Sequence, residues 1–135
     1  MGARQLIRLA VEADIPRIVD CVERLVAAVD GPQRVCRVKT GQTLAGLIAS
    51  SDGFVAVSDH GFIAATITQT VISPDPVAVE LGWWASRGGL SLLKAFEEWA
   101  DSKGATLKKM SCAGGAAQRM LERAGYRQAE TAMVK

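Results

Sequence analysis

Apolar residues repeat along this chain with two different periods, and these periods predict strands and helices. Over 77–84 they fall on alternate positions, as in a strand with one buried face: Val77, Val79, Leu81 and Trp83. After Gly89 they recur every three or four residues, as in an amphipathic helix: Leu92, Leu93, Phe96, Trp99 and Ala100. The stretch VAVELGWWASRGGLSLLKAFEEWADSKG therefore predicts a strand, a tight glycine turn and a long helix.

The same two periods predict the rest of the secondary structure. Further helices are expected at 15–29, 40–49 and 116–124. Further strands are expected at 5–10, 54–58, 62–72, 106–112 and 126–134. Asp14 is the expected N-cap of the helix at 15–29. This order predicts an α/β fold, with a mixed sheet and helices on both faces. With 135 residues, the chain is expected to form one domain, 1–135.

Composition narrows the functional classes. The chain has 16 basic and 14 acidic residues, a net charge of +2, so we expect no nucleic-acid partner. No apolar run approaches the ~18 residues of a membrane span, so no membrane partner is expected. The three cysteines are far apart, which favours a reducing, cytoplasmic compartment without disulfides. One histidine and scattered cysteines give no metal-ligand spacing.

The glycine turn Ser86-Arg87-Gly88-Gly89 is the first candidate for chemistry. A strand that enters a helix through glycines leaves backbone N–H groups and the positive end of the helix dipole free to bind phosphate. The alternative is a plain strand-to-helix connection, in which glycine serves only the tight geometry. His60, in the predicted hairpin turn Asp59-His60-Gly61, is interpreted as a solvated turn residue rather than a base.

Three segments together resemble the GNAT superfamily of N-acetyltransferases. They are IRLAVEADIPRIVDCV, ELGWWASRGGLSLLKAFEEWADSKGA and AAQRMLERAGYRQAE, and the resemblance runs over almost the whole chain. It implies the GNAT (acyl-CoA N-acyltransferase) fold with about six strands. It also implies acetyl (acyl) transfer from acetyl-CoA, as co-substrate, to an amine of a small molecule or protein. A homodimer or larger assembly is compatible with it.

The resemblance also implies site residues. Glu80 is the candidate general base, with a polar cross-sheet pair as the alternative. The candidate coenzyme-binding residues are Trp84, Ala85, Ser86, Arg87, Gly88, Gly89, Leu90 and Ser91. Packing alone is the alternative for Trp84, and a solvated side chain for Arg87. Arg34, Arg37 and Lys39 either select an acidic acceptor or form an exposed charge cluster.

Two departures from the GNAT pattern support a second hypothesis. The loop glycines come early, because Leu90 and Leu92 stand where the pattern has glycine or alanine. Leu121 stands where many members have the tyrosine that protonates the leaving thiolate, while Tyr126 matches a structural aromatic. The alternative function is therefore a catalytically silent binding or structural protein of this fold, for example a phage protein associated with the virion.

Overall fold

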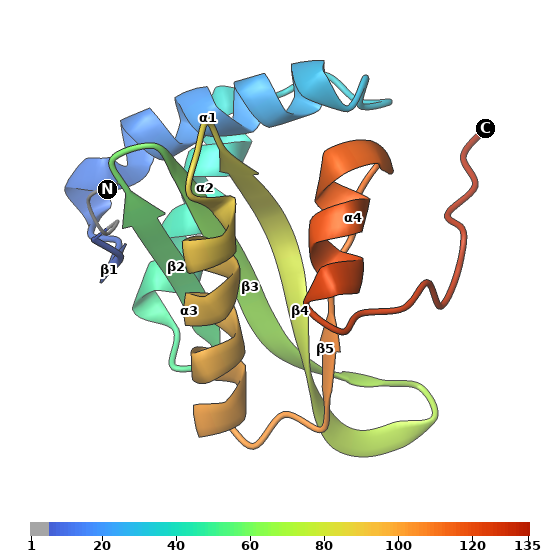
Figure 1. Ribbon diagram of the computed structural model, residues 1–135. Helices are drawn as coiled ribbons and strands as arrows, with labels where there is room; N and C mark the ends of the chain where they lie inside the picture. Colours follow the sequence, from blue (N-terminus) through green and yellow to red (C-terminus); the bar gives the residue numbers. More distant parts are fainter. Residues whose placement is uncertain (1–5) are drawn as a thin grey trace.

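The computed structural model describes residues 6–135 and contains a five-stranded mixed sheet in the order β1-β2-β3-β4-β5. The strands are β1 (Arg8–Leu9), β2 (Gly53–Ser58), β3 (Gly61–Thr70), β4 (Ser73–Ala85) and β5 (Leu107–Lys109). Neighbours from β1 to β4 are antiparallel, whereas β5 runs parallel to β4 (Figure 1). The crossover from β4 to β5 needs a long connection, which the predicted long helix supplies.

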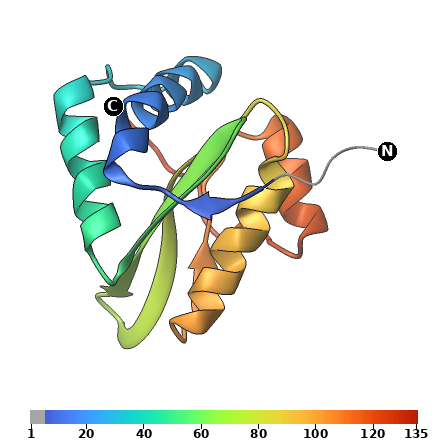
Figure 2. The same cartoon turned by 90° about the vertical axis from the view of Figure 1, so that its left-hand side faces the viewer.

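Helices cover both faces of this sheet, as predicted (Figure 2). One face carries α1 (Ile15–Ala28) and α2 (Arg37–Ala49), and the other carries α3 (Gly89–Ser102) and α4 (Gly115–Arg123). A short 3₁₀ turn, η1 (Glu12–Asp14), precedes α1. The α/β fold class predicted from the sequence is therefore confirmed.

Asp14 differs in detail from its predicted role as a side-chain cap of α1. It occupies the N-cap position, but its carboxylate makes no capping bond to that helix. Instead it accepts the Val11 N–H at 2.8 Å and pairs with Arg8 at 2.7 Å. The Arg8 hydrogen bond is the main cause that holds the pKa of Asp14 well below its usual range. The carboxylate therefore ties β1 to the turn that begins the first helix.

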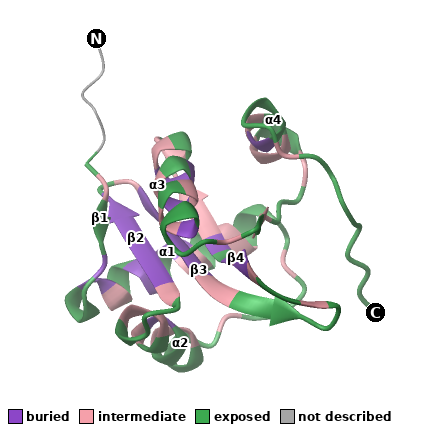
Figure 3. Ribbon diagram, turned by 90° about the horizontal axis from the view of Figure 1, so that it is seen from below, coloured by how far each residue is buried: buried purple, intermediate pink, exposed green. Residues whose placement is uncertain are grey.

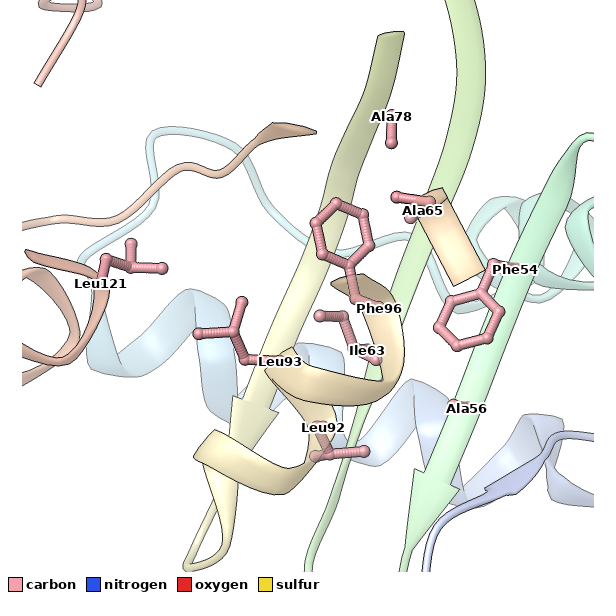
Figure 4. Packing of buried hydrophobic residues seen from close by; sticks show 10 residues of the cluster. Phe54, Ala56, Ile63, Ala65, Ala78, Leu92, Leu93, Phe96 and Leu121 are labelled. Atoms are coloured by element: carbon pink, nitrogen blue, oxygen red, sulfur yellow. The ribbon is translucent and has the colours of Figure 1, made fainter. Parts of the chain in front are cut away.

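Two hydrophobic clusters share the sheet. The cluster under α3 and α4 includes Phe54, Ile63, Leu92, Leu93, Phe96 and Leu121 (Figure 4). The cluster under α1 and α2 includes Ile18, Val19, Leu44, Val55, Val57 and Phe62. Successive residues of β2 and β3 alternate between the two clusters, so these strands are buried on both faces over Phe54–Ser58 and Gly61–Ala65 (Figure 3).

The two terminal strands expected from the sequence are where the prediction is wrong. β1 is only two residues long, and position 5 of the expected strand lies outside the described residues. Residues 126–134 form no strand; the Lys109–Glu130 ion pair, at 2.6 Å, links this segment to β5. Neither face of YRQAETAMV is consistently apolar, so pairing it with the sheet would bury little apolar surface.

Candidate active site

A β-bulge in β4 determines where Glu80 points. Ala64 pairs with Gly82 but Ala65 pairs with Glu80, so Leu81 is an extra residue in β4. Because successive strand residues alternate between faces, this extra residue reverses the alternation. Glu80 therefore lies on the α3 side with its partner Ala65, and Leu81, predicted to be buried with Val79 and Trp83, is 52% exposed.

Glu80 is buried at the point where β4 and β5 stop pairing. The last paired residues are Val79 and Lys109, and β4 then continues to Ala85 paired with β3 only. The Glu80 carboxylate accepts the Ser111 N–H at 3.0 Å, from the chain that follows β5. Burial raises the pKa of Glu80 to about 7, although the Ser111 hydrogen bond opposes this rise. This carboxylate can therefore gain and lose a proton near neutral pH.

We expect burial of Glu80 to make the free energy of unfolding fall as pH rises. The pKa of Glu80 is ordinarily 4.5 and is about 7 in the folded chain. Between these values the folded chain keeps the proton that the unfolded chain loses, so ionising Glu80 lowers the free energy of unfolding as pH rises. The rise corresponds to roughly 3 kcal/mol, fully felt only above the folded pKa. In urea unfolding, Glu80→Gln should be more stable than the parent at pH 8 by ~1–3 kcal/mol. The two proteins should match at pH 4; a constant difference at both pH values would contradict burial of the ionised carboxylate as the cause.

The segment Ser86–Ser91 turns sharply from β4 into α3. Gly88 has φ 75°, a left-handed conformation that glycine adopts without strain, and α3 begins at Gly89. Ser91 donates its N–H to the Gly88 carbonyl at 3.1 Å. Within residues 6–135, the N–H groups of Gly89 and Leu90 have no backbone acceptor. These two donors lie at the start of a 14-residue helix, where free N–H groups and the helix dipole favour negative charge.

The tip of the β2–β3 hairpin holds this segment in place. Ser86 donates its N–H to the His60 carbonyl at 2.9 Å, and its hydroxyl donates to the same carbonyl at 3.4 Å. Arg87 Nε donates to His60 Nε2, also at 2.9 Å. The interpretation of His60 as a solvated turn residue therefore missed its contacts. These contacts arise because β3 pairs with β4, and this pairing cannot be derived from the sequence alone.

Trp84 and Ala85 lie beside this loop, but Trp84 faces the opposite side of the sheet from Glu80. Arg24 of α1 stacks over the Trp84 ring, 5.6 Å from its centre. A cavity of about 380 Å³ opens here; it is lined by Arg17, Asp20, Cys21, Arg24, Asp59, His60, Gly61, Trp84 and Ser86. Ala85 pairs with Gly61 and packs against the α3 cluster. The structure thus groups Ser86–Ser91 together, and separates them from Glu80 by about 20 Å of extended strand.

Three other residues discussed in the sequence analysis, Leu121, Tyr126 and Arg37, lie in positions that do not suit a catalytic or ligand-binding role. Leu121 is buried in the cluster under α3 and cannot supply a proton. The Tyr126 hydroxyl is buried with no hydrogen-bond partner in the described residues, and burial and then Glu97 raise its pKa. Arg37 pairs with Asp20 at 2.9 Å and also with Glu23, so it joins α2 to α1 rather than facing a ligand.

Within residues 6–135 no group of histidines, cysteines and carboxylates could hold a metal ion, and no helix is long and apolar enough to cross a membrane. Cys21, Cys36 and Cys112 are all free thiols. Cys21 is buried, which raises the pKa of its thiol, while the other two are exposed. The candidate chemistry of the described chain therefore rests on Glu80 and on the loop before α3.

Comparison with known proteins shows what other chains share this fold. The sequence matches no protein-family model and no curated protein. Among solved structures, a transcriptional regulator from Bacillus halodurans C-125 superposes with a TM-score of 0.76 at 19% identity, covering 98% of this chain and 99% of its own. A candidate acetyltransferase from Arthrobacter sp. FB24 gives 0.75 at 20% identity, covering 100% and 93%.

A third neighbour is the aminoglycoside N-acetyltransferase AAC(6')-Iy, solved in complex with CoA. It superposes with a TM-score of 0.71 at 16% identity, covering 100% of this chain and 95% of its own. The same enzyme has been solved with the bisubstrate analogue CoA-S-monomethyl-acetylneamine. At these identities the comparison establishes the fold. The chain therefore has the fold of these acetyltransferases, which is the fold that its resemblance to the GNAT superfamily predicts.

Proposed function

We propose that residues 1–135 form one acyltransferase domain that transfers an acetyl (acyl) group from acetyl-CoA to an amine. The observation that carries this proposal is Glu80, a buried carboxylate with a pKa near 7 where β4 and β5 diverge. Where β4 and β5 separate beside Glu80, the edge of β4 that faces β5 has unpaired backbone groups. The extended thioester arm of acetyl-CoA can lie along this edge. Support for an amine acceptor comes from the neighbour named as an aminoglycoside N-acetyltransferase and its acetylneamine analogue complex.

In this proposal, the start of α3 binds the pyrophosphate of the coenzyme through the N–H groups of Gly89 and Leu90. Arg87 adds a charged contact. Glu80 takes the proton from the acceptor ammonium, directly or through water, so that the neutral amine attacks the thioester carbonyl carbon. Backbone N–H groups at the β4 bulge stabilise the developing oxyanion, since the extra residue of a bulge is left unpaired in the ladder.

The bond from the carbonyl carbon to sulfur then breaks, the attacking nitrogen gives its surplus proton to solvent, and the thiolate takes a proton. Leu121 cannot donate it, so we assign this proton to bulk water, and positioning of the two reactants supplies much of the rate. The acceptor is an amine of a small molecule or protein, and the proposed compartment is the cytoplasm. The substitution by Leu121 also favours the second candidate, a catalytically silent binding protein of this fold. The fold itself does not decide between the two.

Calorimetric titration with acetyl-CoA and with free CoA separates these functions. Saturable binding of both ligands, followed by acetylation of a panel of amines, is the result expected for the enzyme. Binding without turnover on any amine would favour the silent protein. No heat at millimolar ligand would overturn coenzyme binding and, with it, the proposed enzyme.

Gly89→Val tests the anion-binding position directly. The added side chain begins 3.5 Å from the Trp83 ring, an ordinary contact, so the fold should persist while the branched side chain crowds the phosphate. We expect CoA affinity to fall at least tenfold, a loss of about 1.4 kcal/mol or more. Gly46→Val is the matched control, because Gly46 lies in α2 with open space around it. Equal affinities for the two variants in calorimetry would place the coenzyme elsewhere.

A further inference from the structure

We propose that His60 is a positioning residue for the coenzyme. It holds Arg87 beside the start of α3, so that the rest of the guanidinium faces the pyrophosphate. This inference rests on the proposed function, since it concerns the same phosphate position. It assigns a role to the hairpin tip, which lies 27 positions from Arg87 in sequence and contributes nothing to the coenzyme site by resemblance.

The backbone fixes where His60 stands. Gly61 pairs with Ala85, and a Cβ added at Gly61 would lie 2.2 Å from the Trp84 carbonyl oxygen. No side chain fits there, so the hairpin tip approaches the end of β4 as closely as backbone allows. The Ser86 N–H bond to the His60 carbonyl, at 2.9 Å, adds a second attachment. The imidazole therefore reaches the loop from a rigid base rather than from a free turn.

The hydrogen bond from Arg87 to His60 uses one edge of the guanidinium and leaves the other edge free to bind a ligand. A guanidinium has five N–H donors, and His60 occupies the one on Nε, at 2.9 Å. Within residues 6–135 no other hydrogen bond or ion pair of Arg87 is formed. The four N–H groups on its two Nη atoms remain, and this fork matches two phosphate oxygens. Without His60, the exposed Arg87 side chain would lose more rotamer freedom when the coenzyme binds, and this loss would weaken binding.

The contact needs a neutral imidazole. Nε2 accepts a hydrogen bond only while it carries no proton, so the ring proton must be on Nδ1. The side chains that share the cavity with His60 include Arg17, Asp20 and Arg24 of α1 and Asp59 of the hairpin. An acceptor at this position, rather than a charge, is therefore what holds Arg87.

Equilibrium CoA binding by calorimetry tests this role without involving Glu80 chemistry. At pH 8, His60→Ala should weaken CoA binding about 3- to 10-fold, the range of one hydrogen bond. The double variant with Arg87→Ala should bind no more weakly than Arg87→Ala alone, since both changes remove one interaction. His60→Gln should restore affinity, because its amide oxygen can accept from Arg87 Nε. Asp59→Asn, on the same hairpin tip, is the control and should leave affinity unchanged.

The rescue by His60→Gln separates positioning from simple packing. A purely structural role of the imidazole would not depend on a hydrogen-bond acceptor, so His60→Gln should then bind CoA as weakly as His60→Ala. Circular dichroism confirms that each variant is folded.

The outcomes distinguish this inference from the proposed function. If the parent binds CoA but the effects of His60→Ala and Arg87→Ala simply add, His60 does not act through Arg87 and the inference fails alone. The same holds if His60→Gln binds CoA as weakly as His60→Ala. If the parent binds no CoA at all, the proposed function fails and the inference fails with it.

Discussion

Glu80→Gln is expected to lower kcat for amine acetylation by about 10²–10⁴, the usual contribution of a general base. Glutamine keeps the size of the side chain and can still accept the Ser111 N–H, but it cannot take a proton. CoA affinity should change little, because the N–H groups proposed to bind the pyrophosphate lie at the start of α3, beyond the end of β4. The measurement is steady-state kinetics beside calorimetric CoA titration.

The pH profile gives this prediction a second test. In the parent, kcat should rise with pH through the pKa of Glu80, about 7, and then level off, since the base works only when ionised. Glu80→Gln should lose this limb. Glu98→Gln, an exposed carboxylate of α3, is the matched control and should keep both the rate and the limb. Unchanged turnover in Glu80→Gln would remove Glu80 from the mechanism.

Phe96→Ala is expected to destabilise the fold by about 3–5 kcal/mol, the range for a large aromatic removed from a core. Phe96 is 0% exposed in the cluster under α3, and its ring lies 6.3 Å from that of Trp99, which stacks on Phe54. The loss is a large share of the total stability of a typical domain, 5–15 kcal/mol in general. Urea unfolding followed by tryptophan fluorescence measures it.

Lys94→Ala is the control for that experiment, because Lys94 is exposed on the same helix. Its effect should stay within about 0.5 kcal/mol. A loss below about 1 kcal/mol for Phe96→Ala would mean that α3 does not pack through this residue. This experiment therefore tests the prediction from the sequence that α3 packs on the sheet through Leu93 and Phe96.

Local periodicity predicted the helices well, because their apolar faces repeat over many residues. The spacing of Leu92, Phe96 and Ala100 marks the same face that the structure buries. The bulge at Leu81 could not be predicted in this way. One extra residue reverses the alternation of a strand, and only pairing with Ala64 and Ala65 reveals it. Strict alternation would put Glu80 on the same face as Trp84, whereas Glu80 lies on the α3 side with Trp83 and Trp84 lies on the α1 side.

The candidate site was predicted in part for the same reason. Segments that are continuous in sequence, such as Ser86–Ser91, could be proposed from a motif and a helix start. Contacts between distant segments could not. The Ser111 N–H bond to Glu80 spans 31 positions, and the Arg87 bond to His60 spans 27. Glu80 owes its raised pKa to burial, which also depends on tertiary packing rather than on neighbours in the chain.

The double-sided burial of β2 and β3 makes the two hydrophobic clusters mechanically dependent on each other. Val55 and Phe62 face α1 and α2, while their chain neighbours Phe54 and Ile63 face α3. Any change that shifts these strands on one face must move the side chains on the other, because a close-packed interior transmits displacement. A ligand or a substitution under α1 can therefore alter the environment of Glu80 through the sheet, without touching it.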